Sequence, residues 1–160
     1  MSEPSPAPAR IEPYTRTIHA RWGDMDFNGH MRNTAYLDAA GDLRMRYFAD
    51  HGFSAGEFER RQIGPVILED SLSYFRELHL LEEVEVGLTL AGASEDGSRW
   101  RMRNDFRRPD GQRICRVESL GGWLDLGTRK LAAPPAELKA LLLGMPRAEG
   151  WTALESLLRR

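Results

Sequence analysis

An alternation of apolar and polar residues in the middle of the chain limits the possible folds more than any other feature. Apolar side chains occupy every second position over residues 84–90, the period of a strand that buries one face. The same period returns over residues 99–107, after a turn-forming stretch at residues 94–97. It puts four arginines on one face of the second strand: Arg99, Arg101, Arg103 and Arg107. Together the two segments predict an antiparallel hairpin.

Three more strands are predicted around this hairpin. Residues 109–111 form a turn, because their proline presets φ and their glycine accepts a positive φ. Residues 114–126 then return as a strand beside the hairpin. Upstream, residues 14–22 and 63–75 are also predicted strands, the second rich in β-branched and aromatic residues. The sequence therefore predicts five strands.

A long helix is predicted between the first two strands, where apolar residues recur at helical spacing over residues 36–48. Asn33 or Thr34 can cap its start and Gly52 can end it, so about 18 residues would span roughly 27 Å. This order of elements predicts an α+β fold, a five-stranded antiparallel sheet wrapped around one long helix. Because one helix covers one face of the sheet, we expect a second copy of the chain to cover the other face or an edge.

The two ends are predicted to lie outside this domain, which spans residues 13–144. The first ten residues hold three prolines and few apolar side chains, so residues 1–12 are expected to be a flexible tail. Pro134 and Pro135 open a short helix that Gly144 ends. Apolar residues at helical spacing over 151–158 predict that residues 145–160 form a helical extension.

Composition and motifs exclude several classes of function. The 22 Lys and Arg residues against 24 Asp and Glu give a net charge of -2, without the electrostatic signature of a nucleic-acid or membrane binder. A single cysteine, Cys115, rules out an internal disulfide, and its apolar strand context predicts a core residue. We therefore expect a soluble cytoplasmic protein. The motifs of serine hydrolases, P-loop NTPases and zinc proteases are absent, so no metal site is predicted.

Polar residues are concentrated where the first strand meets the long helix: Asp24, Asp26, Asn28, Gly29, His30 and Asn33. One interpretation is a plain loop whose side chains make turn hydrogen bonds and cap the helix. The other is a reaction site, in which N–H groups at the helix start hold an oxyanion near a carboxylate and an imidazole. Spacing alone leaves both interpretations open.

The same stretch resembles a family signature. Arg21-x-x-Asp24-x-Asp26-x-x-Gly29-His30-x-x-Asn33-x-x-Tyr36-Leu37 is similar to the motif of 4-hydroxybenzoyl-CoA thioesterase-like proteins, which belong to the hotdog-fold acyl-CoA thioesterases. The resemblance extends over roughly residues 14–143. It implies a hotdog fold, an acyl-CoA substrate, a homodimer or homotetramer, and no cofactor beyond the CoA of the substrate.

The resemblance also implies roles for individual residues. Asp26 falls on the catalytic carboxylate, and Asp24 is expected to be structural. The backbone N–H at or near Asn33 corresponds to the donor that polarises the thioester carbonyl. Gly29 lets the loop approach the substrate, and His30 orients Asp26 or the substrate.

Three further residues are predicted to contact the substrate. Arg32 replaces an asparagine that is common in the family and can meet a substrate carboxylate or a CoA phosphate. Tyr36 adds to the aromatic lining of the presumed cleft, so medium-chain or aromatic acyl groups are expected. Glu69 occupies a strand position that lines the cleft of the partner subunit in relatives, although a solvent-facing glutamate is an equal alternative.

The predicted reaction is thioester hydrolysis, with Asp26 as nucleophile or general base. Two alternatives remain open at this stage: an acyl carrier protein in place of CoA, and a module that binds acyl-CoA without hydrolysing it. A dehydratase or hydratase on the same fold is not favoured, because the spacing of its Asp/His pair is not found in this sequence. The arginines on residues 99–107 form either a solvated face or a binding patch for the CoA phosphates.

Overall fold

A computed structural model describes residues 12–158, so the predicted tail lies outside the described residues except for Glu12. The elements alternate once between strand and helix and then continue mainly as strands, as expected for an α+β chain. In chain order they are β1 (Tyr14–His19), the 3-10 helix η1 (Trp22–Asp24), α1 (Ala35–Asp50), α2 (Ala55–Arg61), β2 (Ile63–Tyr74), β3 (Glu83–Ala93), β4 (Arg99–Arg107), β5 (Arg113–Asp125), β6 (Lys130–Leu131), α3 (Ala136–Leu143) and β7 (Arg147–Ala153).

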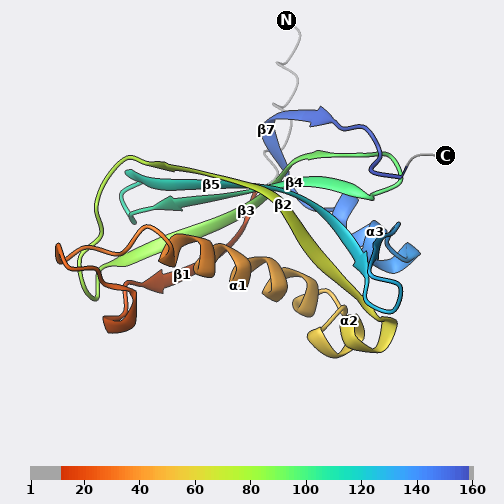
Figure 1. Ribbon diagram of the computed structural model, residues 1–160. Coiled ribbons are helices and arrows are strands. Elements are labelled where there is room, and N and C mark those ends of the chain that lie inside the picture. Colours follow the sequence, from red (N-terminus) through yellow and green to blue (C-terminus); the bar gives the residue numbers. More distant parts are fainter. Residues whose placement is uncertain (1–11, 159–160) are drawn as a thin grey trace, which may run out of the picture.

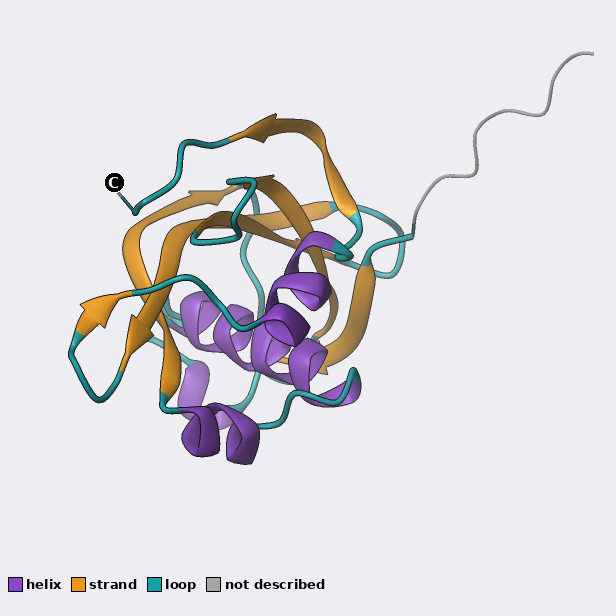
Figure 2. Ribbon diagram, turned by 90° about the vertical axis from the view of Figure 1, so that its right-hand side faces the viewer, coloured by secondary structure: helices purple, strands orange, loops and turns teal. Residues whose placement is uncertain are grey.

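The sheet confirms the five predicted strands and adds two. Its main path runs β1-β3-β4-β5-β2, with antiparallel pairing throughout. The short β6 pairs with β5, and β7 pairs with β3 in parallel. The sheet curves around α1, which crosses its concave side (Figure 1). Seen from the side, the strands form a curved wall over the helices (Figure 2).

Strand β4 has the predicted two-residue period. Every second side chain is buried against the helices, including Trp100 and Phe106, while the intervening arginines are half-buried on the other face. Arg103 on that face donates to Glu118 of β5 at 2.9 Å. This cross-strand pairing favours the solvated face over a patch of free cations.

Helix α1 begins and ends within two residues of the predicted limits. Its buried side chains form the stripe that faces the sheet: Ala35, Tyr36, Ala40, Leu43, Arg44, Tyr47 and Phe48. Gly52, two residues beyond the last helical residue, has a φ of 91°, so it supplies the positive φ that commonly follows a helix. No helix within residues 12–158 combines the length and the apolar character needed to cross a membrane.

The predicted C-terminal helix is wrong. Residues 147–153 form strand β7, which follows Pro146 and contains Gly150 at a φ of 78°. The backbone N–H of Leu90 donates to Pro146 at 2.8 Å, and that of Leu154 donates to Ala93 at 2.9 Å. Pairing with β3 thus gives the backbone of this segment its hydrogen bonds in an extended conformation. These bonds outweigh the helical spacing of its apolar residues.

Strands β1 and β7 divide one edge of β3 between them. β1 pairs with β3 from Glu83 to Leu88, and β7 pairs with it from Leu90 to Ala93. Gly92 makes the second contact possible, because a Cβ atom there would lie 2.7 Å from the carbonyl oxygen of Thr152. The opposite end of the sheet is β2, which pairs only with β5 among the described strands.

Candidate active site

The two aspartates of the motif have different surroundings. Asp24 is buried at the end of η1, where its carboxylate accepts bonds from the backbone N–H and the guanidinium of Arg21, at 3.0 to 3.2 Å. The hydrogen bond from the Arg21 side chain holds the pKa of Asp24 below its usual range. Asp24 is therefore a structural anion that fixes the loop, as the motif implied.

Asp26 lies at the exposed tip of a small turn. Its backbone N–H donates to His30 at 2.8 Å, and Gly29 closes the turn with a φ of 77°. One carboxylate oxygen, Oδ1, accepts from the backbone N–H groups of Asn28 (2.8 Å) and His30 (3.1 Å). The other oxygen, Oδ2, has no hydrogen-bond partner within residues 12–158. The turn thus holds the carboxylate in place and leaves one oxygen available.

The start of α1 supplies free backbone donors. Thr34 is the N-cap residue, but no side chain accepts a hydrogen bond from the first turn. The N–H of Ala35 donates to Arg32 at 3.0 Å, whereas those of Tyr36 and Leu37 have no acceptor in the described part of the chain. Unpaired N–H groups at the positive end of a helix dipole are suited to bind an oxyanion.

His30 links this turn to the segment after β2. Its Nε2 lies 2.9 Å from a carboxylate oxygen of Glu77, and its ring packs edge-on against His79 with centroids 5.2 Å apart. The imidazole therefore contacts Glu77, while it is the backbone of His30 that bonds to Asp26. Ligand atoms of His30, Glu77 and His79 all lie within 4.8 Å of one another. Glu77 and His79 are exposed, and exposed clusters of this kind are common without an ion, so this cluster alone does not indicate a metal site.

A cavity of about 360 Å³ brings four of the predicted site residues together. Asp26, His30, Asn33 and Tyr36 all line it, and the remaining walls include the end of β2 and the residues after it: Tyr74, Phe75, Arg76 and Glu77. The hydroxyl of Tyr74 donates to the carbonyl of Asn33 at 3.0 Å. The motif assigned no role to these four wall residues, since they lie about forty positions beyond it and only the fold brings them there.

The other predicted substrate contacts lie outside this cavity. Gly29 lines a neighbouring hollow with Trp22 and Asp26. Arg32 donates to the carbonyl of Gly23 and to Thr34, so its guanidinium ties η1 to the start of α1.

Glu69 is exposed on β2, next to an irregularity in the pairing with β5 between residues 67 and 69. It lines neither the cavity of Asp26 nor the hollow of Gly29. Any contact between Glu69 and a substrate would therefore need the cleft of another subunit.

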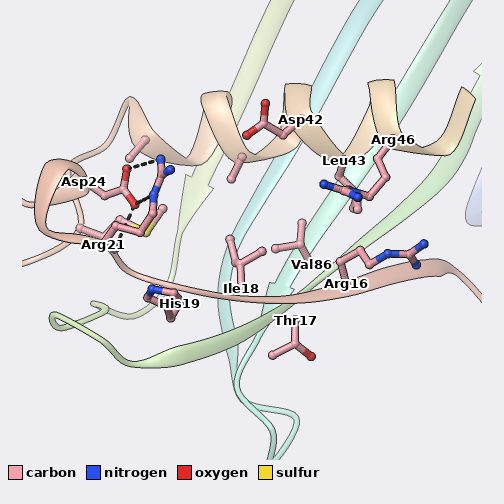
Figure 3. A pocket seen from close by; sticks show the side chains of 13 residues that line it. Arg16, Thr17, Ile18, His19, Arg21, Asp24, Asp42, Leu43, Arg46 and Val86 are labelled. Atoms are coloured by element: carbon pink, nitrogen blue, oxygen red, sulfur yellow. Dashed lines mark hydrogen bonds and ion pairs between the residues drawn. The ribbon is translucent and has the colours of Figure 1, made fainter. Parts of the chain in front are cut away.

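A separate cavity of about 320 Å³ lies on the β1 side of α1 (Figure 3). Arginines line it, but Arg21 is bound to Asp24, and Arg16 is bound to Asp50 at 2.6 Å. Its floor is apolar, with Ile18, Leu43 and Val86 among the lining residues. Asp26 is not part of it, so the motif carboxylate and the helix-start donors meet only on the β2 side of α1.

Comparisons with known proteins agree with this arrangement. The sequence model of the thioesterase-like superfamily matches residues 20–142, a range that contains the turn, α1 and the central strands. Among curated proteins, no sequence matches the chain.

Similar solved structures share the fold. A hypothetical protein from Staphylococcus aureus, solved in complex with CoA, superposes with a TM-score of 0.76 at 24% identity, covering 86% of this chain and 87% of that one. A 1,4-dihydroxy-2-naphthoyl-CoA thioesterase from Synechocystis gives a TM-score of 0.73 at 17% identity, covering 81% and 95%. A gentisyl-coenzyme A thioesterase gives 0.71 at 15% identity, covering 80% and 98%. By its matched sequence and its sheet curled around one long helix, the chain belongs to the thioesterase-like superfamily and has the hotdog fold.

Proposed function

We propose that the protein is an acyl-CoA thioesterase that hydrolyses its substrate at Asp26. The observation that supports this most is that a fixed carboxylate and the first turn of α1 line one cavity, with helix donors left unpaired. A thioester carbonyl placed between them would have its oxygen at the N–H groups of Tyr36 and Leu37. Its carbon would then face the free oxygen of Asp26.

The proposed chemistry follows from this placement. In the addition step the carbonyl oxygen gains negative charge, which the helix-start donors stabilise because they are already oriented. Asp26 either attacks the carbonyl carbon, giving a mixed anhydride that water then hydrolyses, or removes a proton from the attacking water. In both routes the C–S bond breaks, the thiolate of CoA takes up a proton, and the free acid leaves. The reaction requires no metal and no redox cofactor.

His30 and Tyr74 are proposed to position the reacting groups. His30 holds Asp26 through its backbone and Glu77 through its ring. Tyr74 bonds to the carbonyl of Asn33, just before α1, and so fixes the approach of β2 to the helix start. We also propose that the protein is a homodimer or homotetramer, with the β2 edge as the contact between copies.

Replacing Asp26 by asparagine tests the mechanism. The amide side chain keeps an oxygen to accept from the turn N–H groups, so the fold should survive while the nucleophile or base is lost. We expect kcat for a panel of acyl-CoA thioesters, measured as released thiol, to fall by about 10²–10⁴-fold with much less change in substrate binding.

Asp24→Asn is the matched control. It lies two positions away, outside the cavity of Asp26, and should lower stability rather than kcat. Retention of more than about a tenth of wild-type kcat by Asp26→Asn would overturn the mechanism. Binding of acyl-CoA without thiol release by the wild type would instead indicate a binding module, and activity on acyl carrier protein alone would change the substrate carrier.

A further inference from the structure

A second cavity lies between α1 and β2, farther along the helix than the site of Asp26. Its volume is about 250 Å³, close to the lower end of ligand pockets, which span about 300–1,000 Å³. Most of its wall is apolar, with side chains from α1, β2 and the sheet core: Leu37, Met45, Phe48, Pro65, Ile67, Trp100, Met102 and Trp123. Arg44 lines the same cavity.

Arg44 is buried, with 8% of its surface exposed. Its Nε donates to Oδ1 of Asn104 at 3.0 Å, and Asn104 is itself fully buried and donates to the carbonyl of Gly87 at 3.1 Å. This chain of bonds fixes the orientation of the guanidinium. Nη2 is buried without an acceptor, whereas Nη1 is not among the buried unpaired atoms, although it too has no hydrogen-bond partner within residues 12–158. The two terminal nitrogens of the Arg44 guanidinium therefore have no partner among the described residues.

The two acids that line the cavity form no ion pair with Arg44. Asp38 is exposed and lies 3.5 Å from Arg32, and Asp70 is exposed and accepts from Ser119. Neither carboxylate forms an ion pair with Arg44 within 4 Å, although Asp70 is close enough for its negative charge to raise the pKa of Arg44 against the effect of burial. Burial lowers the pKa of Arg44 to about 10, so the side chain is still charged at neutral pH. A buried charge of this kind is costly unless an anion pairs with it.

The two cavities are separate but follow one another along α1, and Tyr36 of the first and Leu37 of the second are neighbours in the chain. Tyr36 and Tyr74 line the cavity of Asp26, while Arg44 and Pro65 line the second one, so both lie between α1 and β2 in succession. From Tyr36 to Arg44 the helix rises by about 12 Å, at 1.5 Å per residue. An acyl chain whose thioester lies at the start of α1 can therefore extend along the apolar wall toward the guanidinium.

We propose that Arg44 binds the distal carboxylate of the acyl chain, so that the preferred substrates are dicarboxylic acyl-CoAs of medium length. The proposal rests on the proposed thioesterase function and names the substrate class of that site. A carboxylate offers two oxygens to the two unpaired nitrogens of a guanidinium, the bidentate geometry that arginine favours. The apolar wall would bury the methylene chain between the two ends.

Pairs of substrates with equal chain length test the assignment. Wild-type protein is assayed with adipoyl-CoA against hexanoyl-CoA, and with suberoyl-CoA against octanoyl-CoA. We expect a higher kcat/KM for the dicarboxylic member of at least one pair. Arg44→Met, which keeps much of the side-chain volume, should lower that ratio by at least about tenfold, because a hydrogen bond to a charged group is lost. Arg44→Lys should keep part of the preference.

Arg46→Met is the control, since Arg46 is an exposed arginine on the same helix that does not line this cavity. It should change the ratio by no more than about twofold. A measurement on wild-type protein alone covers the case in which Arg44 variants do not fold. Suberate should then inhibit more strongly than octanoate.

The outcomes separate the two proposals. Activity on none of the four substrates, and none on an aromatic acyl-CoA such as benzoyl-CoA, would overturn the thioesterase function itself. Activity on the aromatic acyl-CoA alone would overturn only the assigned substrate class. Activity on all four with the same ratio in wild type and Arg44→Met, or stronger inhibition by octanoate, would overturn only the role of Arg44 and leave it a structural cation.

Discussion

Asp24 and Asp26 are two positions apart, yet their surroundings give them opposite properties. Asp24 is buried, and both of its carboxylate oxygens accept hydrogen bonds from Arg21. Asp26 is exposed, and one of its carboxylate oxygens has no hydrogen-bond partner within residues 12–158. A nucleophile or base needs an accessible lone pair, so only Asp26 meets that requirement. The motif assigned the same roles by resemblance, and the local hydrogen bonds supply a physical reason for them.

The ion pair of Asp24 should make stability depend on pH. Since the hydrogen bond from Arg21 lowers the pKa of Asp24 in the folded state, its contribution is present above the unfolded pKa of about 3.9 and is lost as pH falls through the lower folded value. Arg21 is mostly exposed, so we expect Asp24→Asn to cost only about 1–2 kcal/mol at pH 7. Urea unfolding at several pH values measures the difference in the free energy of unfolding between wild type and Asp24→Asn. This difference should shrink below about pH 4, and a difference that grows with acidity would contradict the assignment.

At the residue scale, sequence reasoning succeeded where contacts are local. The burial of Cys115 followed from its apolar strand, and the structure confirms it with 1% exposure. The turn around Asp26 was placed correctly for the same reason, and the carboxylate of Asp26 accepts its side-chain hydrogen bonds from the backbone N–H groups of Asn28 and His30. Tyr74 and Arg44 could not be given roles from the sequence. Tyr74 contacts Asn33, and Arg44 contacts Asn104, only in the folded protein, because each pair is far apart in the chain.

At the scale of elements, the strands with clear alternation were predicted and the segment with an ambiguous pattern was not. The periods of β3 and β4 are set by one buried face, which the sequence records directly. For β7 the deciding interaction is parallel pairing with β3, about sixty residues earlier. The short α2 and β6 carry too few apolar positions to reveal a period.

Gly92 provides a test of how β7 is held. We expect Gly92→Ala to lower the free energy of unfolding by about 1–3 kcal/mol, because its Cβ would lie too close to the backbone oxygen of Thr152 and β7 would have to shift. Gly87→Ala in the same strand is the control, since its Cβ would meet only side-chain atoms at 3.6 Å or beyond. Urea unfolding measures both, and equal effects of the two substitutions would argue against close docking of β7.

At the scale of the whole molecule, the two edge strands of the sheet, β2 and β1, differ in length and in the polarity of their exposed side chains. β2 is twelve residues long and exposes Ile67, Leu68 and Tyr74 to 43–50% of their surface. β1 is six residues long and carries the exposed Arg16. Long apolar edge strands favour pairing with another chain, and short charged ones resist it. Of these two edge strands, β2 is therefore the more suitable one for the predicted second copy of the chain.

We expect sedimentation at micromolar concentration to give at least twice the monomer mass of 18.2 kDa. Leu68→Lys should shift the protein toward the monomer, because a charge on the edge opposes apolar pairing between copies. Leu81→Lys is the control, since Leu81 is more exposed, at 67%, and lies outside β2. A wild-type monomer with full thioesterase activity would rule out the β2 contact as part of the working enzyme.

The sharing of the β3 edge by β1 and β7 has a consequence for aggregation. If two copies join antiparallel through β2, the contact is symmetric and consumes the long edge of both, so growth stops at a closed pair. A second exposed edge would allow open-ended polymerisation into fibres. The C-terminal strand covers Leu90–Ala93 and leaves in its place a short outer edge that is interrupted at Gly150, with a φ of 78°, and charged at Arg147 and Glu149, features that oppose pairing between chains. Although it lines no wall of the cavity that holds Asp26, β7 would thus help to keep the protein from forming fibres at high concentration.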